Sequence, residues 1–473
     1  MQLPQPVFDM KNKNQTKCHL LRLVDNRFGA PNNADQVRVI STQEKNILSR
    51  YDGIELERWR ELGVAVFSNL PLGDHKVNDE STKSALFTLE SDAQVAGRTW
   101  VNTNNCMGVV KLRDKETGEA VQIEIGSRFD GNAEQFFLTY LLSKVFGGSI
   151  VDLVDLGRDS LWDMLLAFLF RRRLQEASAI GLFKQYQTFN HNDTRVRGRI
   201  DVNEHLRRNI PFSGKVASVT HEITFDNPTN HLIRHALVKV GRKWGGLLAG
   251  GDIMDVRNQL EQATPRWQPG EVAQCIRRKE NRTQIKHPYF RSVYEPLRHV
   301  SLAILRDEGA GLYHQHQEAE GVIFDGSWLW EEYLWTLLQP LGFEHPENKK
   351  KDGAWKPLNG VKFYPDFFHR GSRAILDAKY KRGENRYDGR QDHARQVFGY
   401  MFLLNAIHGG LVKPDGVLDD PEQISRKVIN TEPAFWHDFV LTPSKKSTAI
   451  DFVAEMRRKE DEFQKNVTRS LKL

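Results

Sequence analysis

Two apolar runs in the last third of the chain, Val361–Phe368 and Ala374–Tyr380, flank a turn-like stretch and predict a mostly buried β-hairpin. Three charged residues interrupt it: Asp366 in the first run, and Asp377 and Lys379 in the second. Residues two apart in a strand share a face, so Asp377 and Lys379 point the same way and Asp366 can converge on them. Two buried carboxylates repel each other and are costly without a partner. The hairpin therefore predicts a site for a divalent cation.

The best candidate for this cation is Mg²⁺, for which Mn²⁺ can substitute. Mg²⁺ prefers oxygen ligands, keeps several waters, and usually takes one or two protein carboxylates together with a substrate phosphate. Lys379 would then position or deprotonate a metal-associated water, or neutralise the negative charge that develops on the phosphorane. The alternative is that Asp377 and Lys379 form an exposed salt pair without a chemical role, because the pattern D-x-K is common in proteins.

Predicted helices flank the hairpin on both sides. The upstream helix, Ser327–Leu338, is rich in aromatic residues and leucines, and it carries Glu331 and Glu332. Either glutamate could be a third metal ligand. In the downstream helix, Gln396 and Tyr400 lie four residues apart and therefore share a helical face.

This order of residues resembles the PD-(D/E)xK nuclease superfamily. A Pro-Asp pair is followed by ten residues and then by Asp-Ala-Lys, and the later Gln-to-Tyr segment fits the QhxxY pattern of RecB-type members. The resemblance implies metal ligands Asp366, Asp377 and Glu331, and catalytic or orienting residues Lys379, Gln396 and Tyr400.

At 473 residues the chain is too long for one hydrophobic core, so several domains are expected. The apolar pattern predicts an α/β protein in four parts. We expect a mixed α/β region over residues 1–150, with a hairpin near its end, and a mainly helical domain over 151–320. Residues 321–445 would form a restriction-endonuclease-like domain with a mixed sheet flanked by helices, and 446–473 a C-terminal helix.

Four further stretches carry a resemblance of their own. They are VRGRIDVNEHLRRN (Val196–Asn209), HEITFDNPTNHLIRHAL (His221–Leu237), VQIEIGSRF (Val121–Phe129) and LWEEYLWTLL (Leu329–Leu338). Together they resemble the McrC family, the nuclease subunit of modified-cytosine, McrBC-type restriction systems, and they align Glu331 with the family's acid. The family often has proline-lysine where this chain has Gly126-Ser127. The resemblance covers roughly residues 105–410 and leaves residues 1–100 unassigned.

By that resemblance the chain would be a DNA endonuclease subunit that works with an AAA+ ring of the McrB type, which hydrolyses GTP. The family's N-terminal region enters the ring and stimulates hydrolysis, so residues 1–150 would bind the partner. The partner would read the modified base in double-stranded DNA, and it could also be an ATPase. The sequence contains no P-loop of the form GxxxxGK[ST], so this chain is expected to bind no nucleotide.

Basic residues are candidates for contacts with DNA phosphates. These candidates are Lys349, Lys350 and Lys351, beside the predicted site, and Arg197 and Arg199 in the first McrC-like stretch. The alternative for the two arginines is a structural role, in which they hold a helix–sheet joint through carboxylates such as Asp201. Asn227 and Asn230 predict a turn and a helix N-cap. The formal charge of +6 is compatible with a polyanionic partner but decides little over this length.

Three widely spaced cysteines without a C-x-x-C pattern predict a reducing compartment. The longest apolar stretch, Met164–Phe170, is too short to span a bilayer, and the N-terminus lacks the apolar core of a signal peptide. We therefore expect a cytoplasmic protein without membrane contact. Two rivals to a DNA endonuclease stay open: a non-cleaving scaffold that activates a partner NTPase, and an RNase or repair nuclease with the same core.

Overall fold

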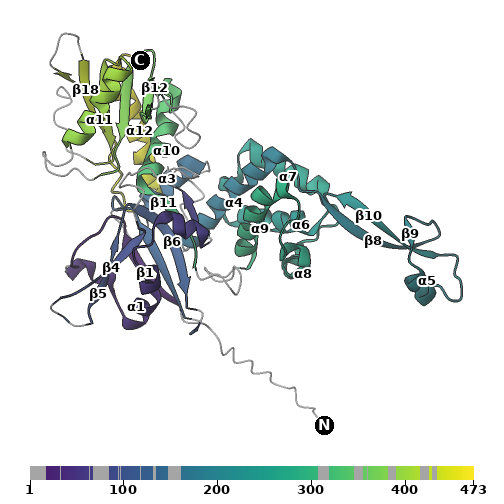
Figure 1. Cartoon of the computed structure of the whole chain (residues 1–473). Coiled ribbons are helices and arrows are strands. Elements are labelled where there is room, and N and C mark those ends of the chain that lie inside the picture. The colour runs from purple at the N-terminus through teal and green to yellow at the C-terminus, as the bar shows by residue number, and fades with distance from the viewer. Residues whose placement is uncertain are drawn as a thin grey trace. The chain divides into compact units, whose positions relative to one another are not determined.

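The computed structural model divides into two compact units (Figure 1). The first contains Met1–Val145 and His314–Leu473, and the second contains Phe146–Tyr313. The residues that the structure describes are 18–31, 33–62, 64–67, 85–93, 95, 97–114, 116–117, 119–130, 135–146, 161–306, 319–345, 355–358, 361–381, 390–415, 425–428 and 434–473. The chain thus leaves the first unit to build the second and then returns to the first.

The first unit begins with a five-stranded sheet in the order β1-β7-β6-β11-β3. Its strands are β1 (Cys18–Val24), β7 (Ala120–Gly126), β6 (Cys106–Arg113), β11 (Ala319–Asp325) and β3 (Ala65–Phe67). β6 and β7 pair antiparallel, which confirms the predicted hairpin, and β1 runs parallel to β7. β11 pairs with β6 and β3, so the boundary that the sequence suggested at residue 320 falls inside a strand of this sheet.

A smaller sheet and two helices pack against these strands. They are β2 (Val39–Ile40), β5 (Thr99–Thr103), β4 (Phe87–Ser91), α1 (Thr42–Leu48) and α2 (Leu56–Glu61). Helix α1 begins at a capping box, because the Ser41 hydroxyl accepts from the N–H of Glu44 and the Glu44 carboxylate accepts from the N–H of Ser41. Trp59 of α2 is fully buried in the core that these elements share with the larger sheet.

The C-terminal part of the first unit contains another five-stranded sheet, in the order β14-β15-β16-β18-β17. Its strands are β14 (Phe367–His369), β15 (Ala374–Ala378), β16 (His408–Lys413), β18 (Ala434–Val440) and β17 (Ser425–Val428). β14 and β15 pair antiparallel, as the predicted hairpin requires, and β15, β16 and β18 run parallel. The start of the predicted first run is a separate strand, β13 (Val361–Phe363), which pairs with β12 (Trp355–Leu358).

Helix α11 (Arg390–Leu403) packs on β15 and β16 of this sheet. Met401 of the helix and Ile375 of β15 belong to the same core. The approach is close, because a Cβ atom on Gly409 of β16 would lie 2.2 Å from the Met401 sulfur. Ile375 faces this helix, so Asp377, two residues further along the strand, faces it as well.

Three helices of the first unit meet around one buried carboxylate. They are α3 (Phe136–Phe146), α10 (Gly326–Leu338) and α12 (Ala449–Leu471). The hydroxyls of Tyr140 and Tyr333 donate to Glu460 at 2.8 and 2.7 Å, and Lys144 lies 2.6 Å from the other oxygen of Glu460. This network joins the predicted C-terminal helix to one helix from each of the two chain segments that form the unit.

The second unit contains the helices α4 (Leu161–Ile180), α6 (Pro228–Lys243), α7 (Gly251–Ala263), α8 (Val272–Arg277) and α9 (Pro288–Arg306). It also contains a three-stranded sheet that the sequence analysis did not predict, with β8 (Gln185–Asp193), β10 (Val216–Thr224) and β9 (Arg199–Ile200). Figure 1 shows β8 and β10 extending from the helices as an arm that carries β9 and α5 (Val202–Arg208) at its far end. Across the described residues, no helix has the length and apolar character needed to cross a membrane.

Candidate active site

The three charged residues of the predicted hairpin meet at the end of β15. The antiparallel register of β14 and β15 places Asp366 beside Asp377. The N–H of Ala378 donates to Asp366 Oδ2 at 2.8 Å, which holds that carboxylate against β15. Lys379 Nζ lies 2.6 Å from Asp377 Oδ2. The structure therefore brings together the two acids and the lysine that the sequence singled out.

Burial dominates the electrostatics of this cluster. It raises the pKa of Asp366, and the ammonium of Lys379 and the N–H of Ala378 only partly oppose it. Burial also raises the pKa of Asp377, and the neighbouring Asp366 raises it further. Burial lowers the pKa of Lys379, but the two carboxylates outweigh this effect and leave the pKa above its ordinary value. One ammonium thus faces two carboxyl groups whose charged forms are disfavoured, so a further cation would stabilise the cluster.

The carboxylate oxygens of Asp377 are suitable ligands for such a cation. Its side chain is 1% exposed, and its Oδ1 atom has no hydrogen-bond donor among the described residues. Buried carboxylate oxygens normally have a partner, and Mg²⁺ binds oxygen ligands of this kind. Asp366 and Asp377 therefore fit a metal held by two carboxylates. In the described part of the chain, however, no three His, Cys, Asp or Glu side chains are grouped to hold a metal, so Glu331 does not complete the predicted three-acid set.

Glu331 still belongs to the electrostatic surroundings of the cluster. It lies on α10, is 9% exposed, and its carboxylate raises the pKa of Lys379. The neighbouring Trp330 anchors α10 against the sheet, because its indole N–H donates to the carbonyl of Val412 at 3.3 Å. Glu331 therefore acts on the cluster through its charge and not as a third metal ligand.

Helix α11 brings the predicted orienting pair to the same face of the sheet. Gln396 Nε2 donates to the hydroxyl of Tyr400 at 3.2 Å. Burial raises the pKa of Tyr400, Gln396 lowers it, and the negative charges of Asp366 and Asp377 raise it. The charges of both acids therefore act on the phenol.

The N-terminal sheet reaches the same corner through a contact that the sequence did not predict. Arg128, directly after β7, donates to the carbonyl of Tyr380 and lies 3.1 Å from the carboxylate of Asp25. Its guanidinium also stands over the Tyr380 ring, 4.6 Å from the centroid. The Tyr380 hydroxyl lies 2.7 Å from Ser127 Oγ, and a Cβ atom on Gly126 would meet the Gln135 side chain at 2.8 Å. The Gly-Ser pair at which this chain departs from the McrC pattern is thus accommodated by these contacts.

The structure says little about the residues that were predicted to contact DNA phosphates. Lys349, Lys350 and Lys351 lie outside the described residues. Arg197 and Arg199 lie on the arm of the second unit and are exposed. Asp201 caps α5 by accepting from the N–H of Glu204 at 3.0 Å, and Glu204 pairs with Arg207 at 2.8 Å. Asp201 thus caps a helix, whereas the sequence suggested that it would pair with Arg197 or Arg199 at a helix–sheet joint.

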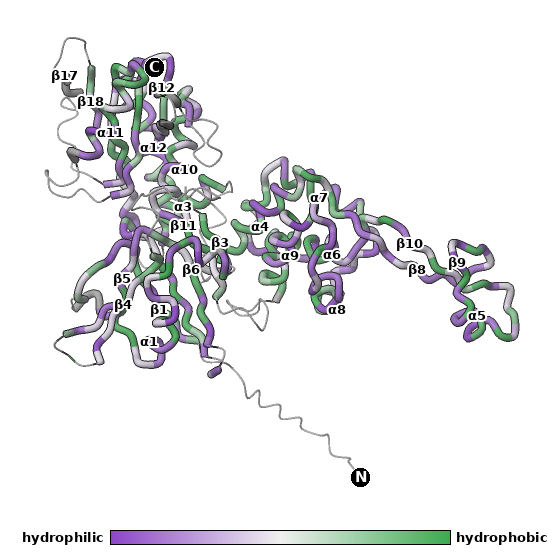
Figure 2. The backbone as a smooth tube through the Cα atoms, viewed as in Figure 1, coloured by the Kyte–Doolittle hydropathy of each residue, from purple (hydrophilic) through white to green (hydrophobic). Residues whose placement is uncertain are grey.

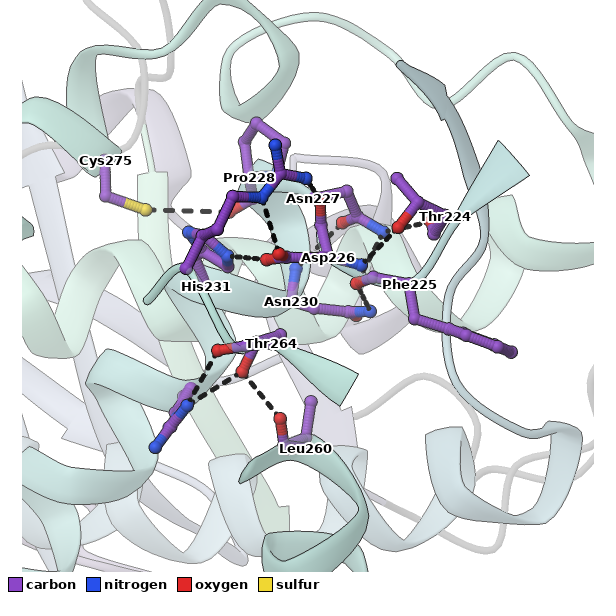
Figure 3. Close-up of polar contacts among 12 residues, drawn as sticks. Thr224, Phe225, Asp226, Asn227, Pro228, Asn230, His231, Leu260, Thr264 and Cys275 are labelled. Carbon is purple, nitrogen blue, oxygen red and sulfur yellow. Dashed lines mark hydrogen bonds and ion pairs between the residues drawn. The ribbon is translucent and has the colours of Figure 1, made fainter. Parts of the chain in front are cut away.

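The FDNPTNH stretch holds the base of the arm to α6, as Figure 3 shows. Asn227 is the N-cap of α6 and accepts from the N–H of Asn230 at 3.0 Å, which confirms the predicted turn and cap. Asp226 lies 2.5 Å from His231 and 2.7 Å from Arg266. The hydrogen bonding of this McrC-like stretch is therefore structural.

A family model supplies the deciding comparison. The model described as the McrBC 5-methylcytosine restriction system component matches residues 101–414, more than half of the chain. The chain belongs to this McrBC family. The matched range includes the four McrC-like stretches, the hairpin with its three charges, and the Gln396–Tyr400 pair.

Two solved structures are similar to this chain. The first is a refined half-complex from a tetradecameric assembly of Thermococcus gammatolerans McrB AAA+ hexamers with bound McrC. The sequence identity is 15% and the TM-score is 0.48, and the match covers 94% of this chain and 100% of that chain. The second is the cryo-EM structure of the Thermococcus gammatolerans McrBC complex, at 15% identity and a TM-score of 0.30, with 68% and 87% covered. No curated protein matches the sequence.

Proposed function

We propose that this chain is the endonuclease subunit of a McrBC-type restriction or anti-phage defence system, and that it hydrolyses DNA phosphodiesters with Mg²⁺. The observation that carries the proposal is the meeting of Asp366, Asp377 and Lys379 at the end of β15 in a chain of the McrBC family. Asp377 and Lys379 are 1% and 18% exposed, which disfavours the alternative of an exposed salt pair.

The C-terminal sheet supports a PD-(D/E)xK core. A hairpin carries both acids, two parallel strands follow it, and α11 covers the face to which the charged residues point. The preceding helix, α10, adds Glu331, whose negative charge acts on Lys379.

In this proposal, Asp366 and Asp377 hold Mg²⁺ or Mn²⁺, which when bound polarises the phosphate and lowers the pKa of a bound water. Lys379 keeps its proton, because the neighbouring carboxylates hold its pKa above the ordinary value. Its ammonium therefore stabilises negative charge on the phosphate oxygens instead of removing a proton. Gln396 and Tyr400 orient the site from α11.

The proposed partner is an AAA+ GTPase or ATPase ring of the McrB type, since the similar Thermococcus assembly contains McrB AAA+ hexamers with bound McrC. The sequence predicts that residues 1–150 contact this ring. The arm of the second unit is a further candidate, because it exposes large apolar side chains such as Tyr186, Leu206 and Phe212. In Figure 2, hydrophobic and hydrophilic segments alternate along the arm and its tip.

The test uses the chain expressed together with its AAA+ partner. Plasmids with and without 5-methylcytosine are incubated with the complex, Mg²⁺ and either GTP or ATP, and both DNA cleavage and NTP hydrolysis are measured. The proposal predicts that wild type cuts DNA, whereas Asp377→Ala loses cutting and keeps the stimulation of NTP hydrolysis. EDTA should abolish cutting by wild type.

The same assay separates the rivals. If the wild-type complex shows stimulated NTP hydrolysis but does not cut DNA, the chain is a scaffold that activates its partner and not a nuclease. Cutting of RNA, or of damaged DNA in preference to modified DNA, would assign the same core to an RNase or a repair nuclease.

A further inference from the structure

A hollow of about 520 Å³ lies beside Lys379, within the first unit. Four of its lining residues are cationic: Arg27, Arg128, Lys379 and Lys381. Asn26 and Asn105 add amide groups, and no carboxylate is found among the described residues that line it. Its size is within the range of pockets that hold a small ligand, and its chemistry favours an anion.

The wall formed by the N-terminal sheet is held by its backbone. The N–H of Asn26 donates to the carbonyl of Asn104 at 2.9 Å, and Arg27 exchanges two backbone hydrogen bonds with Thr103 at 3.0 and 2.9 Å. Asn26 has a left-handed φ of 54°, which asparagine tolerates better than most residues. Arg27 therefore projects from a fixed turn.

Two of the four cations are engaged by carboxylates, and the other two have no carboxylate partner among the described residues. Arg128 pairs with Asp25, and Lys379 pairs with Asp377. Arg27 has no ion-pair partner among the residues that the structure describes.

Lys381 has an imidazole as its hydrogen-bond partner. Its Nζ atom lies 3.2 Å from His393 Nε2. Burial, together with Lys379 and Lys381, lowers the pKa of His393 to about 4, so this imidazole is neutral at pH 7. Asn105 Oδ1 is buried in the wall and accepts no hydrogen bond from the described residues.

We propose that this hollow binds backbone phosphates of the DNA strand next to the bond that is cut, with Arg27 and Lys381 as the phosphate contacts. The inference rests on the proposed nuclease function, because Lys379 belongs to both the cluster and the hollow. Phosphate contacts of this kind position a duplex without reading its bases. The N-terminal sheet would then hold substrate in addition to its predicted contact with the partner.

The experiment measures binding of the full chain to a fluorescent duplex DNA by anisotropy, at several salt concentrations. All proteins carry Asp377→Asn to prevent cutting, and the variants are Arg27→Gln and Lys381→Gln. Arg370→Gln is the matched control, because it removes the same charge at the opposite end of β15, where Arg370 pairs with Glu344. Each hollow variant should bind about tenfold more weakly. The slope of log K against log salt should fall by about 1 for each lost contact, and the control should bind unchanged.

Two further variants guard against a folding artefact: Arg27→Lys and Lys381→Arg keep the charge and should recover most of the affinity. Equal binding by the hollow variants and the control would overturn the proposal, and so would charge-keeping variants as weak as the glutamine variants. Displacement of the duplex by RNA or a nucleoside triphosphate more readily than by unlabelled DNA would overturn the DNA assignment. If DNA binding depends on the hollow but the complex with intact Asp377 never cuts DNA, the nuclease function is refuted and the phosphate-binding hollow still stands.

Discussion

The charged corner around Asp377 at the end of β15, in the first unit, and the arm of the second unit depart from ordinary burial in opposite directions. At the corner, Asp377 is only 1% exposed, although an aspartate side chain is normally ionised and faces solvent. On the arm, Tyr186 and Phe212 are each 69% exposed although their rings are largely apolar. Proteins usually bury apolar groups and expose charges, because each exception costs stability. Each region therefore points to a role beyond folding.

The two regions also differ in how the unusual side chains are supported. The corner is fixed by specific hydrogen bonds, such as that from the N–H of Ala378 to Asp366 and that from Arg128 to Tyr380. The arm rests mainly on the pairing of β8 with β10, and most of its exposed side chains meet no core. We infer that the corner acts on small charged groups whereas the arm binds a protein surface.

The largest expected effect is at the corner. Lys379→Met removes the ammonium that would stabilise charge on the phosphate, so DNA cleavage by the complex should fall about 1000-fold. Stimulation of partner NTP hydrolysis should stay within twofold, on the order of experimental scatter. Arg370→Met is the control and should cut normally. Unchanged cleavage by Lys379→Met would remove the basis for the chemistry assigned to the corner.

The support of the corner is tested next. Arg128→Ala leaves Asp25 buried without its cation, and the free energy of unfolding should fall by about 3–5 kcal/mol. The double variant Asp25→Asn with Arg128→Met should lose less, because no charge is left unpaired. Denaturant unfolding of the three proteins measures this. If the double variant is less stable than Arg128→Ala, the unpaired charge of Asp25 is not the cause of the lost stability.

The arm should respond in the opposite way. Phe212→Ser and Tyr186→Ser remove exposed rings, so the free energy of unfolding should change by less than about 0.5 kcal/mol. Affinity for the AAA+ partner should fall about tenfold or more if these rings are buried in the complex. Titration of the partner, with NTP hydrolysis as the signal, measures the loss. If both variants bind the partner with wild-type affinity, the arm is not the contact, and residues 1–150 are left as the proposed partner-binding region.

The smallest effect concerns pH and metal at the corner. A carboxyl group whose pKa is raised by folding contributes stability below its unfolded pKa near 4, and this contribution is lost as pH rises through its folded pKa, about 7 for Asp377. The metal-free wild type should therefore lose stability relative to Asp377→Asn as pH rises from about 4 to about 7. Millimolar Mg²⁺ should restore on the order of 1 kcal/mol to wild type alone. Parallel pH profiles of the two proteins would contradict the burial of this charge.

The charged cluster could be predicted from sequence because its members lie close together in the chain. Asp366, Asp377 and Lys379 occupy one hairpin, whose alternation shows which residues share a face. The contacts of Arg128 could not be predicted in this way, because its partner Tyr380 is 252 residues away. No local pattern connects the two, although Arg128 lies in the Val121–Phe129 stretch and Tyr380 ends the second run of the hairpin.

The fold shows the same limit. The hairpin of β6 and β7 has alternating apolar residues and α10 is rich in aromatic residues and leucines, and both were predicted, as was α11. β11 was missed because it pairs with β6 across more than 200 residues, which local patterns do not reveal. β8 was missed because its residues alternate between exposed and half-buried, so the strand has no buried apolar face to signal it.

The most direct test of the central claim is a calorimetric titration of Mg²⁺ into the full chain, compared with Asp377→Asn. If the buried charges serve a metal, wild type should bind Mg²⁺ at a site that Asp377→Asn lacks, and Mn²⁺ should compete for it. Identical isotherms for the two proteins, or no binding to either with duplex DNA present, would mean that the carboxylates at the end of β15 are not there to hold a metal.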